Sequence, residues 1–257
     1  MKVCPSGLKT GCLAFCVCGL LLCGGCLSVS QAQKGLAAGS DLFKAATLND
    51  NDLRAVSAKF RASEDQKNRV AAPDSAYARR LARITEKLTS VNGVPLSYKV
   101  YLTKEVNANA APDGSVRVYS GLMDSMNDDE LRFVIGHEIG HVALGHSKKA
   151  MQMAYATSAA RNAVGAVSAQ AGMISDSQIG VLGEKFINSQ FSQSQESDAD
   201  AYSMKFLKDN GYNTKAAGDA LRKLANGGRS GLMEAMFSSH PDSLKRAEKM
   251  DALAASN

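Results

Sequence analysis

Apolar residues recur at helical spacing along much of this chain. The clearest case is the stretch 73–91, where an apolar stripe runs through Tyr77, Leu81, Ile84 and Leu88. Residues three or four apart share one face of a helix, so this stripe predicts an amphipathic helix. Further helices are expected over residues 41–68, 194–208 and 242–254.

Strand patterns are short and few by comparison. Residues 97–103 and 116–120 read as strands, and the Ala-Pro-Asp-Gly sequence at 111–114 is a turn sequence between them. We therefore expect two short strands joined by this turn. Long helical stretches with so little strand predict an α+β fold that is predominantly helical and has a small β-sheet.

One further helix is apolar nearly all round. It begins after Asn127, a good N-cap, and Glu130 stands three positions later, where it can close a capping box. Asp128 and Asp129 place negative charge at the positive end of the helix dipole. Because apolar residues follow on every side as far as Leu144, without a proline, this helix is expected to be buried.

That buried helix carries the sequence His137-Glu138-Ile139-Gly140-His141. Positions four apart lie roughly 40° apart around a helix, so His137 and His141 project from one face and can share one Zn²⁺. Glu138 falls beside that face, where a carboxylate can take a proton from a metal-bound water and return it to the leaving amine. Two histidines can also be ordinary core residues, but burying them beside a glutamate without a metal carries a desolvation cost. The pattern therefore favours a zinc hydrolase.

A catalytic zinc site needs a third protein ligand and an open position for water. His146 lies nine residues beyond His137, and if the helix continues it points roughly 180° away, so we exclude it as a ligand. The better candidate is Glu196, on the helix predicted over 194–208. Asp200, one turn further on, can accept a hydrogen bond from the far ring nitrogen of a ligand histidine. Without the two-histidine helix, the same acidic run would indicate a solvated face.

Together these segments resemble the M48 zinc metallopeptidases and, within them, the LoiP-like lipoprotein proteases of the Gram-negative envelope. The resemblance covers residues from about 73 to 250 and rests on the stretches 98–101, 107–108, 117–124, 137–141, 188–193, 196–200 and 240–241. It implies a zincin-like domain with the sheet beside the active-site helix. It also implies zinc on His137, His141 and Glu196, with Glu138 as the general base.

The same resemblance implies a strand that borders the substrate cleft and pairs with an extended peptide. This strand would consist of Asn107, Ala108, Asn109 and Ala110. The family usually has an aromatic residue between the two alanines, and Asn109 stands there instead. This departure affects the predicted wall of the substrate cleft and not the predicted zinc ligands.

His240 lies in a turn-forming stretch before the last helix, and three roles are open for it. Its ring can donate a hydrogen bond to the oxyanion that forms at the scissile carbonyl. It can instead occupy the open zinc position and hold the enzyme latent, or it can be a surface histidine. Arg246 is either an anchor for this loop or a solvated charge.

The N-terminus has the composition of a secretory signal. Lys2 and Lys9 precede an apolar stretch at 13–22 that is too short to span a bilayer, and small residues precede Cys26. This pattern predicts a bacterial lipoprotein signal peptide over residues 1–25 and acylation of Cys26.

Two neighbouring residues bear on the destination of the mature chain. Leu27, in place of aspartate after the acylated cysteine, favours the outer membrane of a Gram-negative cell. A cut after Ala32 would instead release a soluble periplasmic protein.

Composition indicates one globular domain without disulfides. All six cysteines lie at or before position 26, so the mature chain cannot form an internal disulfide. Cleavage removes two lysines and no acidic residue, so the net charge falls from +5 to +3, too little to indicate nucleic acid. Removing 25 of 257 residues leaves 232, enough for one domain over 41–257. Residues 26–40 form a flexible tether before it, and 41–70 a helical extension of it.

The stretch 150–183 is rich in Ala, Ser and Gly and has few large apolar residues. Its polarity argues against a membrane span. Small residues permit close helix packing, so we expect a lid or a helical hairpin over the cleft.

These features predict a zinc-dependent endopeptidase on the periplasmic side of the outer membrane, tethered by an N-terminal lipid. The expected substrates are unfolded or misassembled envelope polypeptides in extended conformation, and envelope assembly machinery is a further candidate partner. The alternative is a non-proteolytic periplasmic chaperone or assembly factor with a structural zinc. The presence of Glu138 argues against that alternative, since a structural site needs no carboxylate there.

Overall fold

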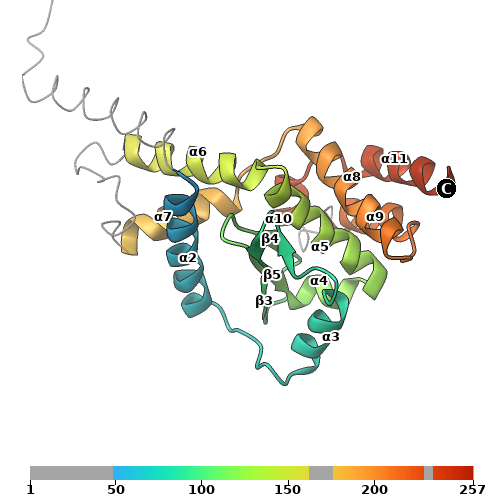
Figure 1. Ribbon diagram of the computed structural model, residues 1–257, viewed down its shortest axis with the longest axis horizontal. Coiled ribbons are helices and arrows are strands. Elements are labelled where there is room, and N and C mark those ends of the chain that lie inside the picture. The colour runs from blue at the N-terminus through green and yellow to red at the C-terminus, as the bar shows by residue number, and fades with distance from the viewer. Residues whose placement is uncertain (1–48, 162–175, 229–233, 257) are drawn as a thin grey trace, which may run out of the picture.

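The computed structural model describes residues 49–161, 176–228 and 234–256 (Figure 1). Its helices are α2 (Asp50–Lys67), α3 (Ala76–Ile84), α4 (Ser120–Ser125), α5 (Asp128–Ala143), α6 (His146–Arg161), α7 (Asp176–Ile187), α8 (Gln193–Asp209), α9 (Ala216–Gly228), α10 (Glu234–Ser239) and α11 (Ser243–Ala255). Its strands are β1 (Ser90–Val91), β2 (Val94–Pro95), β3 (Ser97–Tyr101), β4 (Ala108–Ala110) and β5 (Ser115–Tyr119). The predominantly helical α+β class with a small sheet is confirmed.

The main sheet is mixed and has the order β3-β5-β4. β3 pairs with β5 in parallel, whereas β4 pairs with β5 antiparallel. The turn at 111–114 therefore joins β4 to β5, and the expectation that it joins the strands at 97–103 and 116–120 was wrong. A tight turn cannot connect parallel strands, which need a longer crossover. Gly114 is required in this turn, because its φ is +84° and an added Cβ would lie 2.3 Å from Pro95 O.

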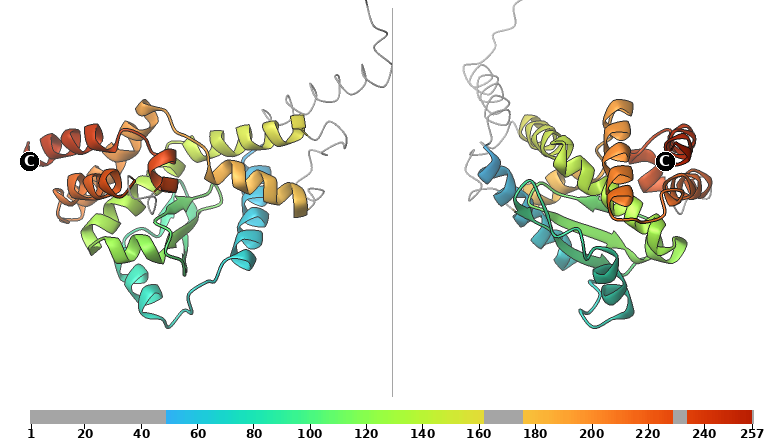
Figure 2. Two further views of the ribbon diagram at one scale, coloured as in Figure 1. Left: turned by 180° about the vertical axis from the view of Figure 1, so that it is seen from behind. Right: turned by 45° about the vertical axis from the view of Figure 1, so that its right-hand side comes forward.

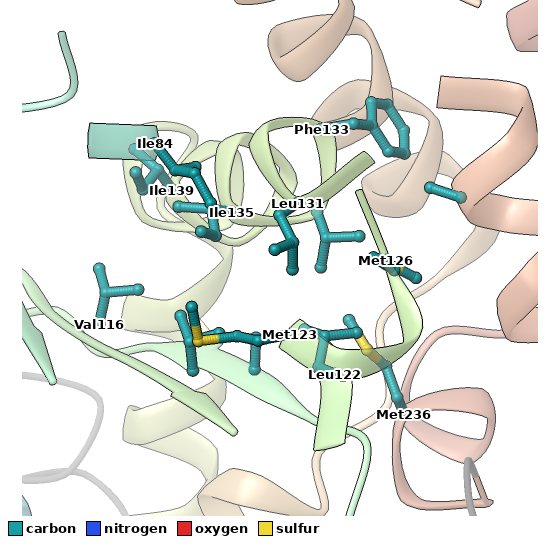
Figure 3. Close-up of a cluster of buried hydrophobic side chains, with 14 of the residues drawn as sticks. Ile84, Val116, Leu122, Met123, Met126, Leu131, Phe133, Ile135, Ile139 and Met236 are labelled. Carbon is teal, nitrogen blue, oxygen red and sulfur yellow. The ribbon is translucent and has the colours of Figure 1, made fainter. Parts of the chain in front are cut away.

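One face of the sheet packs on α5 through apolar side chains. Side chains alternate along a strand, so Val116 and Val118 share this face with the two alanines of β4. Figure 3 shows Val116 facing the helix from which Ile135 and Ile139 project. This apolar layer fixes α5 against the sheet.

The opposite face of the sheet is polar and is covered by α2 (Figure 2). The Asp65 carboxylate accepts hydrogen bonds from Arg117 Nε at 2.8 Å, Lys99 Nζ at 2.7 Å and the Tyr101 hydroxyl at 2.7 Å. These contacts pack α2 against the sheet.

α2, α6 and α7 share a second, smaller apolar cluster that includes Phe60, Met151 and Leu182. Gly183 of α7 packs directly against the Phe60 ring. A Cβ added at this position would lie 2.3 Å from a ring carbon, so a larger residue would displace the ring. Figures 1 and 2 show these three helices on the side of the sheet away from α8, α9 and α11. α6 and α7 pack on each other as a helical pair, and the residues 162–175 between them lie outside the described part.

The helix predicted over 73–91 is shorter than expected. α3 ends at Ile84, and the hydroxyl of the next residue, Thr85, donates a hydrogen bond to Leu81 O at 2.9 Å. Asn92 and Gly93 both have positive φ and form the two-residue turn of the β1–β2 hairpin. Asn-Gly is a strong hairpin signal, although no hairpin was predicted at this position.

The predicted signal peptide, the tether and the acylated Cys26 lie outside the described residues, which begin at 49. Within the described ranges, no helix combines the length and the apolar character that crossing a bilayer requires.

Candidate active site

α5 presents His137 and His141 one turn apart near its C-terminal end. The predicted capping box starts the helix: Asn127 Oδ1 accepts from Glu130 N at 2.9 Å, and the Glu130 carboxylate accepts from Asn127 N at 2.8 Å. The capped N-terminus of α5 and the burial of this helix fix the direction in which both histidine side chains point.

α8 lies close against α5 because glycines of α5 leave room for it. A Cβ at Gly136 would lie 2.6 Å from Ser203 Oγ, and one at Gly140 would lie 3.2 Å from Ala199. Ser203 Oγ also donates to Phe133 O at 2.6 Å. This approach brings the acidic residues of α8 next to the histidines of α5.

Ligand atoms of His137, His141, Glu196 and His240 all lie within 4.8 Å of one another. His137 Nε2 is 3.0 Å from His141 Nε2, and carboxylate oxygens of Glu196 lie 3.5 and 3.3 Å from these two nitrogens. Atoms about 2.0–2.1 Å from a tetrahedral zinc ion lie about 3.3–3.4 Å apart, so the cluster fits one ion. All four residues are buried.

His240 enters this group from the loop between α10 and α11. Its Nδ1 lies 3.2 Å from His137 Nε2 and 3.0 Å from Glu196 Oε1. The side chain is buried, which excludes the surface position that the sequence left open. Burial disfavours its charged form, but the carboxylates of Glu138 and Glu196 outweigh that effect and raise the pKa of His240.

Asp200 orients the ring of His137. His137 Nδ1 lies 2.9 Å from Asp200 Oδ1 and donates a hydrogen bond to this carboxylate. Burial alone would raise the pKa of Asp200, but hydrogen bonds from Arg246 and His137 lower it to about 2, so the group is ionised. Because Nδ1 makes this hydrogen bond, Nε2 is the ring nitrogen of His137 that faces the cluster.

His146 returns to the site instead of pointing away from it. α5 ends at Ala143, and the chain turns at Gly145, with φ +76°, before α6 begins. His146 Nδ1 therefore lies 3.0 Å from His141 Nδ1, although His146 is not among the converging ligand atoms. The premise of a continuous helix was wrong. Phe191 stacks on the His141 ring at a centroid distance of 3.8 Å, a contact that no sequence motif revealed.

Glu138 is buried beside the cluster. Its Oε1 has no hydrogen-bond partner among the described residues and lies 3.4 Å from His240 Nε2. Burial raises the pKa of Glu138, and the nearby His240 and His137 offset this only in part. The group is therefore a stronger base than an exposed carboxylate, as proton transfer from water requires.

Arg246 of α11 is buried as well, so it is not a solvated charge. It forms ion pairs with Glu196 and with Asp200. These carboxylates outweigh the effect of burial and raise the pKa of Arg246, with Asp200 contributing most. These ion pairs thus fix α11 against Glu196 and Asp200 of α8.

The residues predicted to border the cleft lie at the edge of the sheet nearest α5. β4 covers Ala108–Ala110, and the buried Asn107 precedes it directly. β4 pairs with β5 on one side only and contacts α5.

Comparison with known proteins agrees with this geometry. The model of Peptidase family M48 matches residues 75–254, which is more than half of the chain. The chain belongs to peptidase family M48. This M48 chain is 45% identical over 221 residues to the metalloprotease YcaL of Escherichia coli (strain K12), covering 85% of the chain and 86% of that protein. It is also 45% identical over 214 residues to the metalloprotease LoiP of the same organism, covering 83% and 84%. Identity to the mitochondrial metalloendopeptidase OMA1 of Arabidopsis thaliana is 27% over 158 residues, covering 60% and 31%.

The M48 chain is therefore a metalloendopeptidase, and the cofactor of this family is zinc. The donor set fits that ion, because two imidazoles and a carboxylate are typical ligands of catalytic zinc. Burial holds the pKa of His141 well below its ordinary value, so this ring is neutral and has a free lone pair. The Nε2 atoms of His137 and His141 lie 3.0 Å apart, as expected of two rings that can share one cation.

Proposed function

We propose that this M48 metalloendopeptidase hydrolyses unfolded or misassembled envelope polypeptides with a water that Glu138 activates. The observation that carries the proposal is the buried convergence of His137, His141 and Glu196 directly beside Glu138. A metal-binding cluster with a raised-pKa carboxylate at its side is the arrangement that peptide hydrolysis needs.

The proposed roles divide between the metal and the chain. Held by His137, His141 and Glu196, zinc supplies a Lewis acid that polarises the scissile carbonyl and makes water acidic. Glu138 accepts the proton of the attacking water as the new carbon–oxygen bond forms. It then gives this proton to the nitrogen of the leaving amine as the carbon–nitrogen bond breaks. No covalent intermediate with the chain is involved.

The free edge of β4 supports an extended substrate. Asn107 O accepts a hydrogen bond from β5 at 3.0 Å, and Ala111 N donates one to β5 at 2.9 Å. Backbone groups alternate along a strand, so the N–H and C=O groups of Ala108 and Ala110 face the free edge. Ala108 and Ala110 are buried in this conformation, so an extended peptide pairs there once this edge opens. Unfolded chains supply such segments more readily than folded proteins do.

The position of His240 supports the latent role over the oxyanion role in this conformation. Its Nδ1 lies among the ligand atoms, and four protein ligands leave no position for water. We therefore infer that the loop between α10 and α11 moves away from the cluster when substrate enters.

We also propose that the chain is a lipoprotein anchored through Cys26 on the periplasmic side of the outer membrane. The basic start, the short apolar stretch and Leu27 support this placement. Incorporation of labelled palmitate by the wild type and not by Cys26→Ser would support the anchor. Equal lack of label in both, with a mature chain beginning at Gln33, would support the soluble periplasmic alternative.

The decisive experiment is cleavage of casein by the zinc-loaded mature protein. Wild type is compared with Glu138→Gln, which keeps size and packing but removes the base. Glu248→Gln, an exposed carboxylate of α11, is the matched control. We expect wild type and Glu248→Gln to cleave casein, a chelator to abolish cleavage, and Glu138→Gln to retain zinc without cleaving.

Casein that stays intact with zinc-loaded wild type and with His240→Ala would contradict the proposed substrate class. Equal cleavage by Glu138→Gln and wild type would contradict the role of Glu138. The alternative of a non-proteolytic binding protein would regain support if zinc-loaded wild type, His240→Ala and Glu138→Gln all left casein intact.

A further inference from the structure

The side chain of Asn109 lies on the α2 face of the sheet. Asn109 is the register partner of Arg117, whose side chain meets Asp65 of α2 on that face. The flanking Ala108 and Ala110 belong to the apolar core on the other face. A peptide that pairs with the free edge of β4 would place one side chain beside Asn109, at a Cβ–Cβ distance of about 4.5–5.5 Å.

Arg61 of α2 lies directly behind Asn109. Its Nη2 donates a hydrogen bond to Asn109 Oδ1, and its Nε donates to Ser115 Oγ at 2.9 Å. The guanidinium also lies over the Phe60 ring, 4.9 Å from the centroid. The side chain is only 3% exposed, whereas Asn109 is partly exposed and stands between Arg61 and the strand edge.

Arg61 lacks the acidic partner that a buried cation ordinarily has. Its Nη1 has no hydrogen-bond partner, and no carboxylate lies within ion-pair distance, in the part of the chain that the structure describes. Arg117 on the same face differs, since Asp65 neutralises it. The nearby Asp113 is engaged with Ser115, whose hydroxyl donates to it at 2.6 Å.

An unpaired buried charge is costly, so its retention calls for an explanation. Burial, followed by repulsion from Arg117, lowers the pKa of Arg61, as expected of a cation that lacks compensation. A carboxylate that arrived with the substrate would supply both the missing charge and an acceptor for Nη1. Guanidinium and carboxylate match in geometry as two-pronged partners.

We propose that Arg61 and Asn109 form a substrate subsite that selects an Asp or Glu side chain at the position opposite Asn109. This proposal rests on the proposed pairing of the substrate with β4. The guanidinium is buried behind Asn109, so a substrate carboxylate reaches Nη1 when the short, partly exposed Asn109 side chain turns aside and gives up its hydrogen bond to Arg61. Arg61 belongs to α2 and lies outside the residues 75–254 that match the family model.

The test uses a set of extended peptides in which a single Glu is moved along an otherwise neutral sequence. Each peptide has a twin with Gln at the same position. Binding is measured by fluorescence anisotropy on zinc-loaded Glu138→Gln, and cleavage on zinc-loaded wild type. At one position we expect Glu to bind about tenfold or more tightly than Gln, as a charge-assisted pair implies. The KM of the Glu peptide should be lower than that of its Gln twin by the same factor, and kcat should be the same for both.

Two variants identify the residues responsible. Asn109→Asp, nearly the same size, supplies Arg61 with an internal carboxylate, so it should abolish the preference for Glu and raise thermal stability. Arg61→Gln should abolish the preference as well. Lys59→Gln, which removes an exposed cation of the same helix, should leave it intact.

Equal binding of Glu and Gln twins at every position would overturn the proposal. A preference that survives both Asn109→Asp and Arg61→Gln would overturn it too. The anisotropy readout does not depend on catalysis, so failure of the subsite differs from failure of the proposed peptidase activity. If only the subsite proposal fails, neutral peptides are still cleaved. If the proposed peptidase activity fails, no peptide is cleaved.

Discussion

The guanidinium of Arg246 binds Asp200 through two parallel hydrogen bonds, from Nε to Oδ2 at 2.8 Å and from Nη2 to Oδ1 at 2.7 Å. The same guanidinium forms an ion pair with Glu196. One buried cation therefore holds both a proposed zinc ligand and the carboxylate that orients His137. Only a planar fork of donors can serve these partners together.

Arg246→Lys is expected to weaken zinc binding about 10- to 100-fold, although it conserves charge. A lysine ammonium cannot make the two-pronged bond to Asp200 and also reach Glu196. Competition with a chromogenic chelator measures the affinity. Arg222→Lys, at a half-exposed site on α9, serves as the control and should bind zinc like the wild type. Unchanged affinity in Arg246→Lys would show that charge alone suffices.

His146, at the start of α6, contacts Nδ1 of His141. This contact orients the His141 ring, as Asp200 orients the His137 ring. We expect His146→Phe to lower zinc affinity about tenfold, because His141 Nδ1 loses its partner. His146→Asn, which keeps a hydrogen-bonding oxygen, should retain most of the affinity. If both variants bind zinc equally, the contact does not position the ligand.

The converging residues were predictable where one short helical segment determines them. His137, Glu138 and His141 follow from spacing within α5, and Glu196 and Asp200 from spacing within α8. His146 was misjudged because Gly145 ends the helix, and a single glycine four residues after the motif is a weak signal. Arg61 was invisible, since nothing in the sequence tells which of many arginines will be buried by tertiary packing.

The fold shows the same division between local and long-range information. The caps of α5 and the turn at 111–114 depend on neighbouring residues, and the sequence revealed both. The parallel pairing of β3 with β5 depends on a crossover, and short strands do not encode the direction of their partners. The length of α3 was overestimated because Leu88 keeps the apolar spacing after the helix has ended.

His240→Ala is expected to increase casein cleavage severalfold and to weaken zinc binding. In the present conformation His240 Nδ1 lies among the converging ligand atoms, where it would fill the fourth position around a zinc ion, so its removal would open a position for water. A purely oxyanion-stabilising residue would behave oppositely, with a loss of about 100-fold or more in kcat. Measuring both kcat and zinc affinity separates the two roles, and a fall in kcat at full zinc loading would contradict latency.

Asp65→Asn is expected to lower the free energy of unfolding by about 2–3 kcal/mol at pH 7, because Arg117 is left buried without a carboxylate. Burial alone would raise the pKa of Asp65, but hydrogen bonds from Arg117, Lys99 and Tyr101 outweigh it and hold the pKa below its ordinary value of 3.8. A lowered folded-state pKa stabilises the protein above the unfolded-state value, and this stabilisation is lost as pH falls through the folded-state value. The difference between wild type and variant should therefore stay constant from pH 7 to about 5 and narrow toward pH 2.

Urea unfolding followed by circular dichroism at several pH values measures this difference. Asp209→Asn is the control, since Asp209 pairs with Lys205 in solvent and such pairs contribute about 0.5 kcal/mol or less. The control should show almost no pH-dependent difference from the wild type. If the Asp65→Asn difference were as large at pH 3 as at pH 7, the stabilisation would come from packing and not from the ionised carboxylate.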